Sequence, residues 1–133
     1  MASMGRELSG GREGEINRRE DTARALALWE EGLEAQQQER EQQRQGLLSW
    51  ARQELARFFQ DKQVETVYLT GSLLRKNAFS EFSDIDLAVA GLREDYFKLL
   101  VDLEDLMGRW VDVIELEKCR FREQIERQGI RIK

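Results

Sequence analysis

The sequence predicts an α+β fold, in which a small mixed sheet of three to four strands is flanked by helices and preceded by an N-terminal helical extension. Three observations support this fold class. Apolar, β-rich runs bounded by turn residues occur at 65–69, 84–90 and 110–116. Two stretches with apolar residues at helical spacing, 47–59 and 93–107, alternate with them. The chain ahead of the first of these stretches is rich in helix formers and poor in apolar side chains.

The composition suits one domain with an appendage and limits the possible chemistry. The 133 residues carry a net charge of −5, which argues against non-specific nucleic-acid binding through a broad basic face. There is no histidine, so histidine-dependent acid–base catalysis and histidine-ligated zinc are excluded. Cys119 is the only cysteine, so no internal disulfide can form. No apolar run approaches the roughly 20 residues of a membrane span and no signal-peptide core is visible, so we expect a cytoplasmic protein without membrane contact.

The N-terminal part divides in two by composition. Residues 1–20 are rich in glycine, serine and charge, which predicts a disordered tail. Residues 21–46 predict a helical extension, in which Leu26, Trp29 and Leu33 recur at helical spacing before a Gln/Glu/Arg tract with no apolar stripe. The tract is expected to be a solvated helix or a helical connector, and a compatible alternative is a docking arm in which Leu26, Trp29 and Leu33 pack on a partner subunit.

Residues 47–133 form the predicted domain, which begins with an amphipathic helix. Gly46 interrupts the extension without ending it. The apolar stripe that follows at 3.6-residue spacing is expected to pack on the sheet and consists of Leu47, Leu48, Ala51, Leu55, Phe58 and Phe59. The first strand leads into a Gly-Ser turn, and a short helix is expected at 73–76.

The rest of the domain is predicted from turn residues and periodicity. A loop spans 78–83, with Phe79 and Phe82 expected to fold inward. The later elements are a strand at 84–90 ended by Gly91, a helix at 93–107 capped by Gly108, a strand at 110–116, a helix at 119–128 and a short terminal strand at 130–132.

Two aspartates mark the start of the second strand. Because successive strand side chains point to opposite faces, Asp84 and Asp86 share one face of the sheet. Two carboxylates this close repel each other unless water or a cation compensates them, and paired oxygen ligands suit Mg²⁺, which also binds substrate phosphates. The turn at Gly71-Ser72 can present backbone N–H groups and a hydroxyl to phosphate oxygens. Together, these residues predict a metal–nucleotide site.

The same residues resemble a known signature. A Gly-Ser pair, a short spacer and then Ser-Asp-Ile-Asp-Leu are similar to the nucleotidyltransferase motif of the DNA polymerase β superfamily, and more narrowly to the minimal nucleotidyltransferase antitoxins of HEPN toxins. The resemblance covers about residues 47–133 and implies a polymerase-β-like nucleotidyltransferase fold. Two features depart from the usual pattern: eleven residues separate Ser72 from Asp84, where about ten are common, and Lys76-Asn77 stand where a glycine often follows the arginine.

The resemblance also implies roles for individual residues. Three acids would bind two Mg²⁺ ions together with the triphosphate of ATP, and three residues at the turn would bind the nucleotide: Asp84, Asp86 and Asp112, and Gly71, Ser72 and Arg75. Asp112 interrupts an otherwise apolar strand and would also take the acceptor's proton; the alternative is an acid that faces water from an edge strand. Glu115 lies on the opposite face by period two and is the weaker candidate.

The implied function is that of an antitoxin. Minimal nucleotidyltransferases transfer AMP from ATP to a tyrosine of a partner HEPN ribonuclease toxin and so inactivate it, which implies a hetero-oligomer with the toxin and no direct nucleic-acid binding. Two alternatives stand beside this reading. The chain could be a non-catalytic antitoxin that neutralises the toxin by occlusion, or a nucleotidyltransferase acting on a small molecule, although it is too short for the extra substrate domain that such enzymes usually carry.

Overall fold

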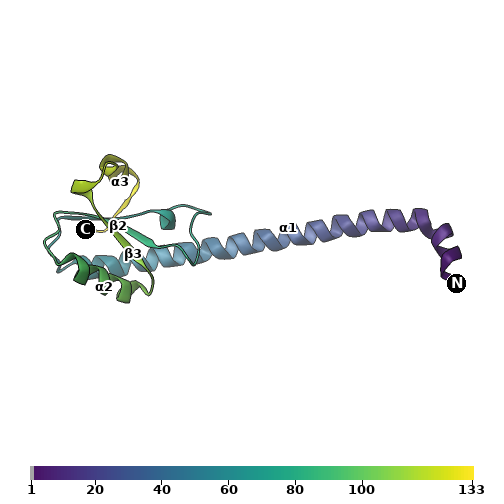
Figure 1. Ribbon diagram of the computed structural model, residues 1–133, viewed down its shortest axis with the longest axis horizontal. Helices are drawn as coiled ribbons and strands as arrows, with labels where there is room; N and C mark the ends of the chain where they lie inside the picture. Colours follow the sequence, from purple (N-terminus) through teal and green to yellow (C-terminus); the bar gives the residue numbers. More distant parts are fainter. Residues whose placement is uncertain (1) are drawn as a thin grey trace. The chain divides into compact units, whose positions relative to one another are not determined.

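The computed structural model describes the backbone of residues 2–133 and the side chains of residues 18–133. The chain divides into two compact units, one up to Glu39 and one from Arg40 onward (Figure 1). Helix α1, Ala2–Phe59, supplies the first unit and the first element of the second. The predicted α+β fold with an N-terminal helical extension is confirmed.

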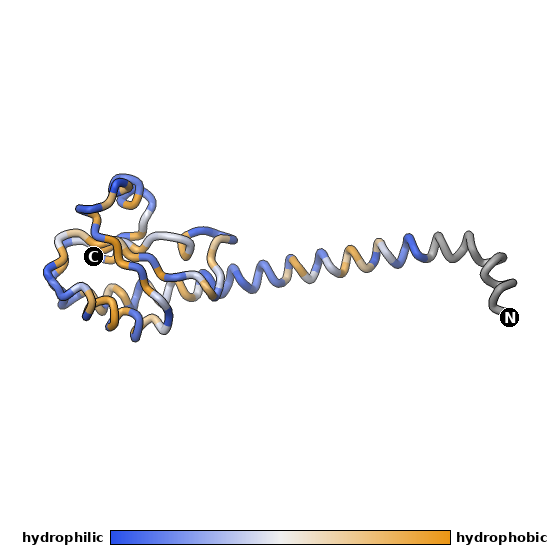
Figure 2. Tube along the Cα trace, viewed as in Figure 1, coloured by the Kyte–Doolittle hydropathy of each residue, from blue (hydrophilic) through white to orange (hydrophobic). Residues whose placement is uncertain are grey.

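The first unit carries an exposed apolar patch. Leu26, Trp29 and Leu33 expose 52%, 63% and 37% of their surfaces, and Figure 2 shows apolar turns of α1 among polar ones. Docking of this patch on a partner stays a prediction. The tail predicted over residues 1–20 also stays a prediction: α1 includes the backbone of most of them, but the side chains of residues 1–17 lie outside the described part of the chain. None of the described helices is long and apolar enough to cross a bilayer.

The second unit is built on a four-stranded mixed sheet with the order β3-β2-β1-β4. Its strands are β1 (Thr66–Thr70), β2 (Ile85–Ala90), β3 (Val111–Glu115) and β4 (Ile130–Arg131). Strand β1 pairs antiparallel with both β2 and β4, whereas β2 and β3 run parallel. Strand β3 therefore lies at an edge of the sheet, beside the strand that carries the acidic pair.

The two faces of the sheet are covered differently because strand side chains alternate. One face packs against α1 and α2 (Tyr96–Met107) through buried residues of three strands: Val67, Leu69, Ile85, Leu87, Val89, Val111 and Val113. On the other face, Ala88 and Ala90 pack with Leu116, and Ile125 of α3 (Arg122–Gln128) covers them. Figure 1 shows α2 on one side of the sheet and α3 on the other. Helix α3 covers the later part of β2, so the starts of β2 and β3 remain available for a site.

The amphipathic end of α1 packs on the sheet, as its apolar stripe over residues 47–59 predicted. Ala51, Leu55 and Phe59 are fully buried against the sheet. One turn before Leu48, Arg44 donates from Nη1 to the backbone oxygen of Leu73 at 2.8 Å, which ties α1 to the segment after β1.

Gly46 lies inside this part of α1 and gives a first testable prediction. A Cβ built on Gly46 meets nothing within 4 Å. Glycine in a helix interior is less favourable than alanine by about 0.5–1 kcal/mol, because it loses more backbone entropy on folding. We expect Gly46→Ala to raise the free energy of unfolding by about this amount in urea titrations. An unchanged or lower value would contradict a regular helix at this position.

Several predicted boundaries are displaced by local hydrogen bonds. The segment after β1 is a single 3-10 turn, η1 (Ser72–Leu74), rather than a helix over 73–76. Helix α2 begins at Tyr96 and not at 93, because the side chain of Asp95 accepts a hydrogen bond from the Lys98 N–H at 3.1 Å and caps it. The helix predicted over 119–128 begins at Arg122 and follows a second 3-10 turn, η2 (Leu116–Lys118).

The loop between η1 and β2 places its two phenylalanines differently. Phe79 packs against the core as predicted, whereas the prediction for Phe82 was wrong, since 86% of its surface is exposed. The Phe82 N–H donates to Ser80 Oγ at 3.3 Å, and the Ser80 N–H donates to Ser83 Oγ at 3.0 Å. These bonds form a tight polar turn, and Phe82 projects from it.

Candidate active site

The Gly-Ser turn lies directly against the second aspartate of the acidic pair. Gly71 follows β1 with φ 84° and ψ −158°, a conformation that essentially only glycine adopts. A Cβ at this position would lie 2.8 Å from Cγ of Asp86, so a side chain would overlap that carboxylate. The turn continues into η1, where the Arg75 N–H donates to the Ser72 oxygen at 3.0 Å. The two halves of the predicted metal–nucleotide site are thus in van der Waals contact.

The register of the parallel strands brings the third acid alongside. Ile85 pairs with Val111, and Asp86 pairs with Asp112. Paired residues on neighbouring strands lie roughly 4.8 Å apart and direct their side chains to the same face. Because Ile85 and Val111 are buried on the α1–α2 face, Asp86 and Asp112 point to the opposite one. Asp112 is an acid on an edge strand facing water, as its alternative interpretation held, and it is also the direct neighbour of Asp86.

The charges around Asp86 indicate how closely the acids gather. Burial raises the pKa of Asp86 above its ordinary value, and the negative charges of Asp112 and then Asp84 raise it further, while Arg75 lowers it. All three other groups are therefore near enough to act on this carboxylate. Asp86 is half-buried, and Asp84 and Asp112 are exposed. A cation bound among them would relieve this repulsion.

The donor set suits Mg²⁺. Its side chains are carboxylates, and neither histidine nor cysteine is close to them in sequence or register. Within residues 18–133, no group of three or more such side chains is placed so that it could by itself hold a metal ion. An ion at these acids would therefore share its coordination with water or a substrate, as Mg²⁺ commonly does with phosphates.

The loop after Arg75 forms its turn without a glycine. Asn77 has φ 67°, in the left-handed region, where asparagine is among the few tolerated non-glycine residues. The Ala78 N–H donates to the Arg75 oxygen at 3.3 Å across this turn. Lys76-Asn77 thus supplies the backbone conformation that a glycine would favour.

Arg109 fixes the starts of both acid-bearing strands. Its Nη1 donates to the Ser83 oxygen at 3.2 Å, and its guanidinium lies 5.0 Å from the centroid of the Phe79 ring. The Ile85 N–H donates to the Trp110 oxygen at 3.0 Å and extends the ladder before β3 begins. Asp84 and Asp86 are therefore held beside Asp112 by both side-chain and backbone bonds.

Sequence reasoning missed three residues at this site. Thr70 pairs with Asp86 on the side of β1, and Trp110 lies two residues before Asp112. Their signal was present, because Thr70 directly precedes the turn and Trp110 shares the period of Asp112. Arg109 gave no sequence signal, since a single surface arginine has many ordinary roles.

Glu115 does not join the acids. It pairs in register with Val89, a residue of the α1–α2 face, and its Oε2 lies 2.8 Å from Nζ of Lys118. Its weaker candidacy is consistent with this placement. Two surface cavities also lie elsewhere: one of about 550 Å³ is lined by residues within 120–128, and one of about 520 Å³ lies between α1 and the loop at Phe79.

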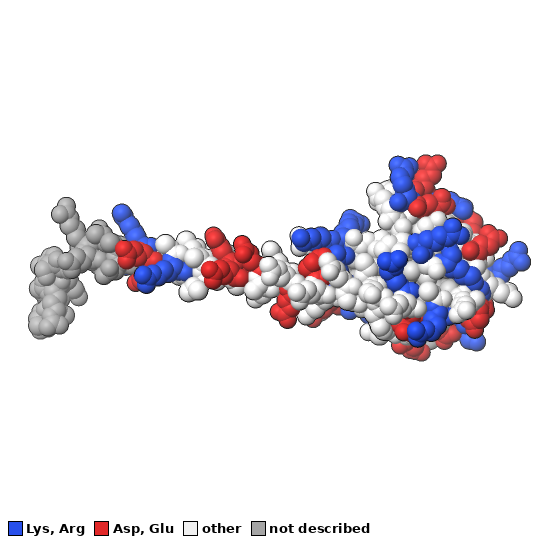
Figure 3. All heavy atoms as spheres, turned by 180° about the vertical axis from the view of Figure 1, so that it is seen from behind, with Lys and Arg blue, Asp and Glu red and all other residues white. Residues whose placement is uncertain are grey.

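Charge is unevenly distributed over the second unit. Figure 3 shows basic side chains grouped near the middle of its rear face, with acidic ones around them. The net charge of −5 therefore does not describe the local potential, and the prediction of no nucleic-acid contact rests on composition alone.

Comparison with known proteins places the second unit in a family. Residues 53–133 match the family described as polymerase beta, nucleotidyltransferase. A crystal structure of a toxin-antitoxin with AMP-PNP is similar, with 22% identity, a TM-score of 0.51 and coverage of 62% of this chain and 72% of that one. A crystal structure of a mutant MntA-HpeT toxin-antitoxin has 20% identity, a TM-score of 0.50 and coverage of 62% and 71%. No curated protein sequence matches the chain.

Proposed function

Since this chain belongs to the polymerase beta nucleotidyltransferase family, we propose that it is a Mg²⁺-dependent antitoxin that transfers AMP from ATP to a tyrosine of a HEPN ribonuclease toxin. The observation that most directly supports this activity is the pairing of Asp86 with Asp112, beside a turn that only glycine can form. The toxin-antitoxin structures of similar fold support the kind of partner, and the AMP-PNP in one of them supports the nucleotide.

In this proposal the two sides of the site have separate tasks. Gly71 and Ser72 contact the β- and γ-phosphates through backbone N–H groups and the hydroxyl, and Arg75 offsets phosphate charge. Asp84 and Asp86 would hold the metal ions, and Asp112 would share the one nearer the acceptor. Two Mg²⁺ ions, when bound, would stabilise the attacking and leaving oxygens.

The transfer step needs no histidine. Asp112 takes the proton of the acceptor hydroxyl, whose oxygen forms a bond to the α-phosphorus of ATP. The bond from that phosphorus to the oxygen bridging to the β-phosphate breaks, and pyrophosphate leaves with the electron pair. Positioning and charge compensation supply most of the rate in such a reaction, which suits a site of three carboxylates and a phosphate-binding turn.

Intact-mass analysis tests this function directly. We expect a HEPN toxin incubated with this protein, ATP and Mg²⁺ to gain the mass of one or more AMP groups, and to gain none with the double variant Asp84→Asn, Asp86→Asn. Glu115→Gln is the matched control, because it neutralises an acid of β3 that lies on the other face, and it should transfer AMP at the wild-type rate.

The same experiment separates the two alternatives. A toxin that is inhibited but unmodified by both the wild type and the double variant would favour neutralisation by occlusion. Transfer of AMP to a small hydroxylated compound such as an aminoglycoside, with no toxin modification, would favour a small-molecule transferase. The left-handed Asn77 weakens the case for a degenerate site, because the altered loop still forms its turn.

A further inference from the structure

An exposed tryptophan stands beside the acids. Trp110 leaves 75% of its surface exposed. Continuing the β2–β3 register by one step places it opposite Asp84, and the bond from the Ile85 N–H to its backbone oxygen, which belongs to the Ile85–Val111 pair, holds its backbone against the start of β2. Single exposed aromatic residues are ordinary on protein surfaces, so exposure alone indicates no function. The location of Trp110 beside the acids is what distinguishes it.

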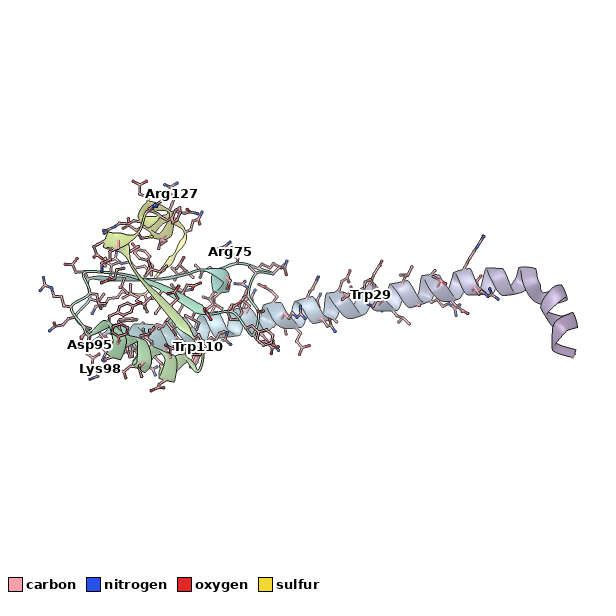
Figure 4. All side chains as sticks on the ribbon, in the orientation of Figure 1. Trp29, Arg75, Asp95, Lys98, Trp110 and Arg127 are labelled. Atoms are coloured by element: carbon pink, nitrogen blue, oxygen red, sulfur yellow. The ribbon has the colours of Figure 1, made fainter. Side chains whose placement is uncertain are left out.

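Its two neighbours in sequence indicate the face to which Trp110 points. Val111 is buried among the residues that face α1 and α2. Arg109 reaches the Phe79 ring, which packs against the same core. Side chains alternate along a strand, so continuing the pattern of β3 back from the buried Val111 assigns Trp110 to the opposite face, which is also the face of Asp112. Figure 4 labels Trp110 at the start of β3.

The order of the strands separates Trp110 from the phosphate-binding turn. Gly71 and Ser72 follow β1, the acids start β2, and Trp110 precedes β3 on the far side of β2. The indole therefore lies on the side where Asp112 would receive the acceptor, across the acids from the triphosphate. Arg109 and the backbone hydrogen bond from Ile85 hold the start of this strand in place, so the backbone that bears the indole is fixed relative to the acids.

We propose that Trp110 forms the acceptor subsite, in which its indole face receives the ring of an aromatic alcohol, the tyrosine side chain, and aligns the hydroxyl with Asp112. This inference rests on the proposed function and adds the residue that selects an aromatic acceptor. Offset or edge-to-face ring pairs stabilise a contact by enough to change affinity by roughly tenfold. Trp110 is a positioning residue in this account, and Asp112 handles the proton.

Steady-state kinetics with the toxin as substrate give the first test. We expect Trp110→Ala to raise the KM for the toxin by about tenfold and to leave the KM for ATP within about twofold, and Trp110→Phe to restore most of the toxin KM. Phe97→Ala is the matched control, because Phe97 is also 75% exposed but lies on α2, and it should leave both constants unchanged. An unchanged toxin KM in Trp110→Ala would overturn the proposal, and so would an increase confined to the KM for ATP.

A binding measurement keeps the inference independent of transfer. In a Trp29→Phe, Trp50→Phe background, Trp110 is the only remaining indole, and its fluorescence should change with N-acetyltyrosinamide but not with AMP-PNP and Mg²⁺ alone. A response to AMP-PNP alone would assign the ring to adenine and overturn the proposal, as would no response to either. If the wild type transfers no AMP but the tyrosine probe still changes the emission, the proposed function fails while the aromatic subsite stands.

Discussion

Asp86→Asn is expected to abolish AMP transfer and, at the same time, to raise the melting temperature of the metal-free protein. The rate of transfer should fall by about a hundredfold or more, because the substitution removes a ligand at the centre of the charge-compensating site. Asp86 pairs with Asp112 on one side and touches Gly71 on the other, so no neighbouring group can replace it. Radiolabelled ATP and the toxin would measure the rate.

The gain in stability follows from the direction of the pKa shift. Burial and the charges of Asp112 and Asp84 raise the pKa of Asp86 above the ordinary value of 3.8. The folded state then holds this proton at pH values where the unfolded chain has lost it, so stability falls as pH rises from about 4 through the raised pKa. Above that pKa, Asp86 is ionised in the folded state and the loss of stability is complete. Asparagine carries no charge, so the variant does not lose this stability. Because solvent screens a half-exposed group, we expect a rise of only about 2–5 °C at pH 7.

Two comparisons make this prediction specific. The difference in melting temperature between wild type and Asp86→Asn should shrink below about pH 4, where the aspartate is protonated in both states. Mg²⁺ should stabilise the wild type, by about 1.4 kcal/mol at ten times its Kd, and stabilise the variant less. A variant that melts at or below the wild-type temperature at pH 7 would show that the carboxylate is not repelled, and the acids would then not form one site.

The sequence could predict the acidic face but not the pairing that completes it. Period two placed Asp84 and Asp86 on one face from their spacing alone. Nothing in the local pattern specifies that β3 lies parallel to β2 with Asp112 opposite Asp86, because strand order and register depend on how the whole core packs. Only the resemblance to a family predicted that Asp112 would join Asp84 and Asp86.

Local competition explains the smaller errors. Apolar character predicted that Phe82 would fold inward, but hydrogen bonds among serines of a tight turn direct it to solvent. The start of α2 was set three residues early, because Asp95 makes a better cap than the residues before it. The exposure of Trp110 was missed as well: its period matches that of Asp112, but an aromatic residue at the start of an apolar strand is usually interpreted as part of the core.

Gly71→Ala is expected to damage both the fold and the site. Its backbone conformation is one that essentially only glycine adopts, so alanine should lower the free energy of unfolding by about 1–3 kcal/mol. The new Cβ would also overlap the carboxylate of Asp86 and push it away from its neighbours. A displacement of about 1 Å at a reacting centre can lower the rate by a hundredfold, so transfer should fall by at least that factor.

Gly108→Ala separates the two effects of the Gly71 substitution. Gly108 ends α2 with φ 67°, so alanine there should also be strained, by about 1–2 kcal/mol, yet a Cβ meets nothing within 4 Å. We therefore expect a comparable decrease in unfolding free energy in urea but a wild-type transfer rate at a temperature where both variants are folded. If Gly108→Ala lost activity as severely as Gly71→Ala, general destabilisation would explain both results. If Gly71→Ala kept its activity, the contact between the turn and Asp86 would have no part in transfer, because the acids would then work without the geometry that this glycine alone allows.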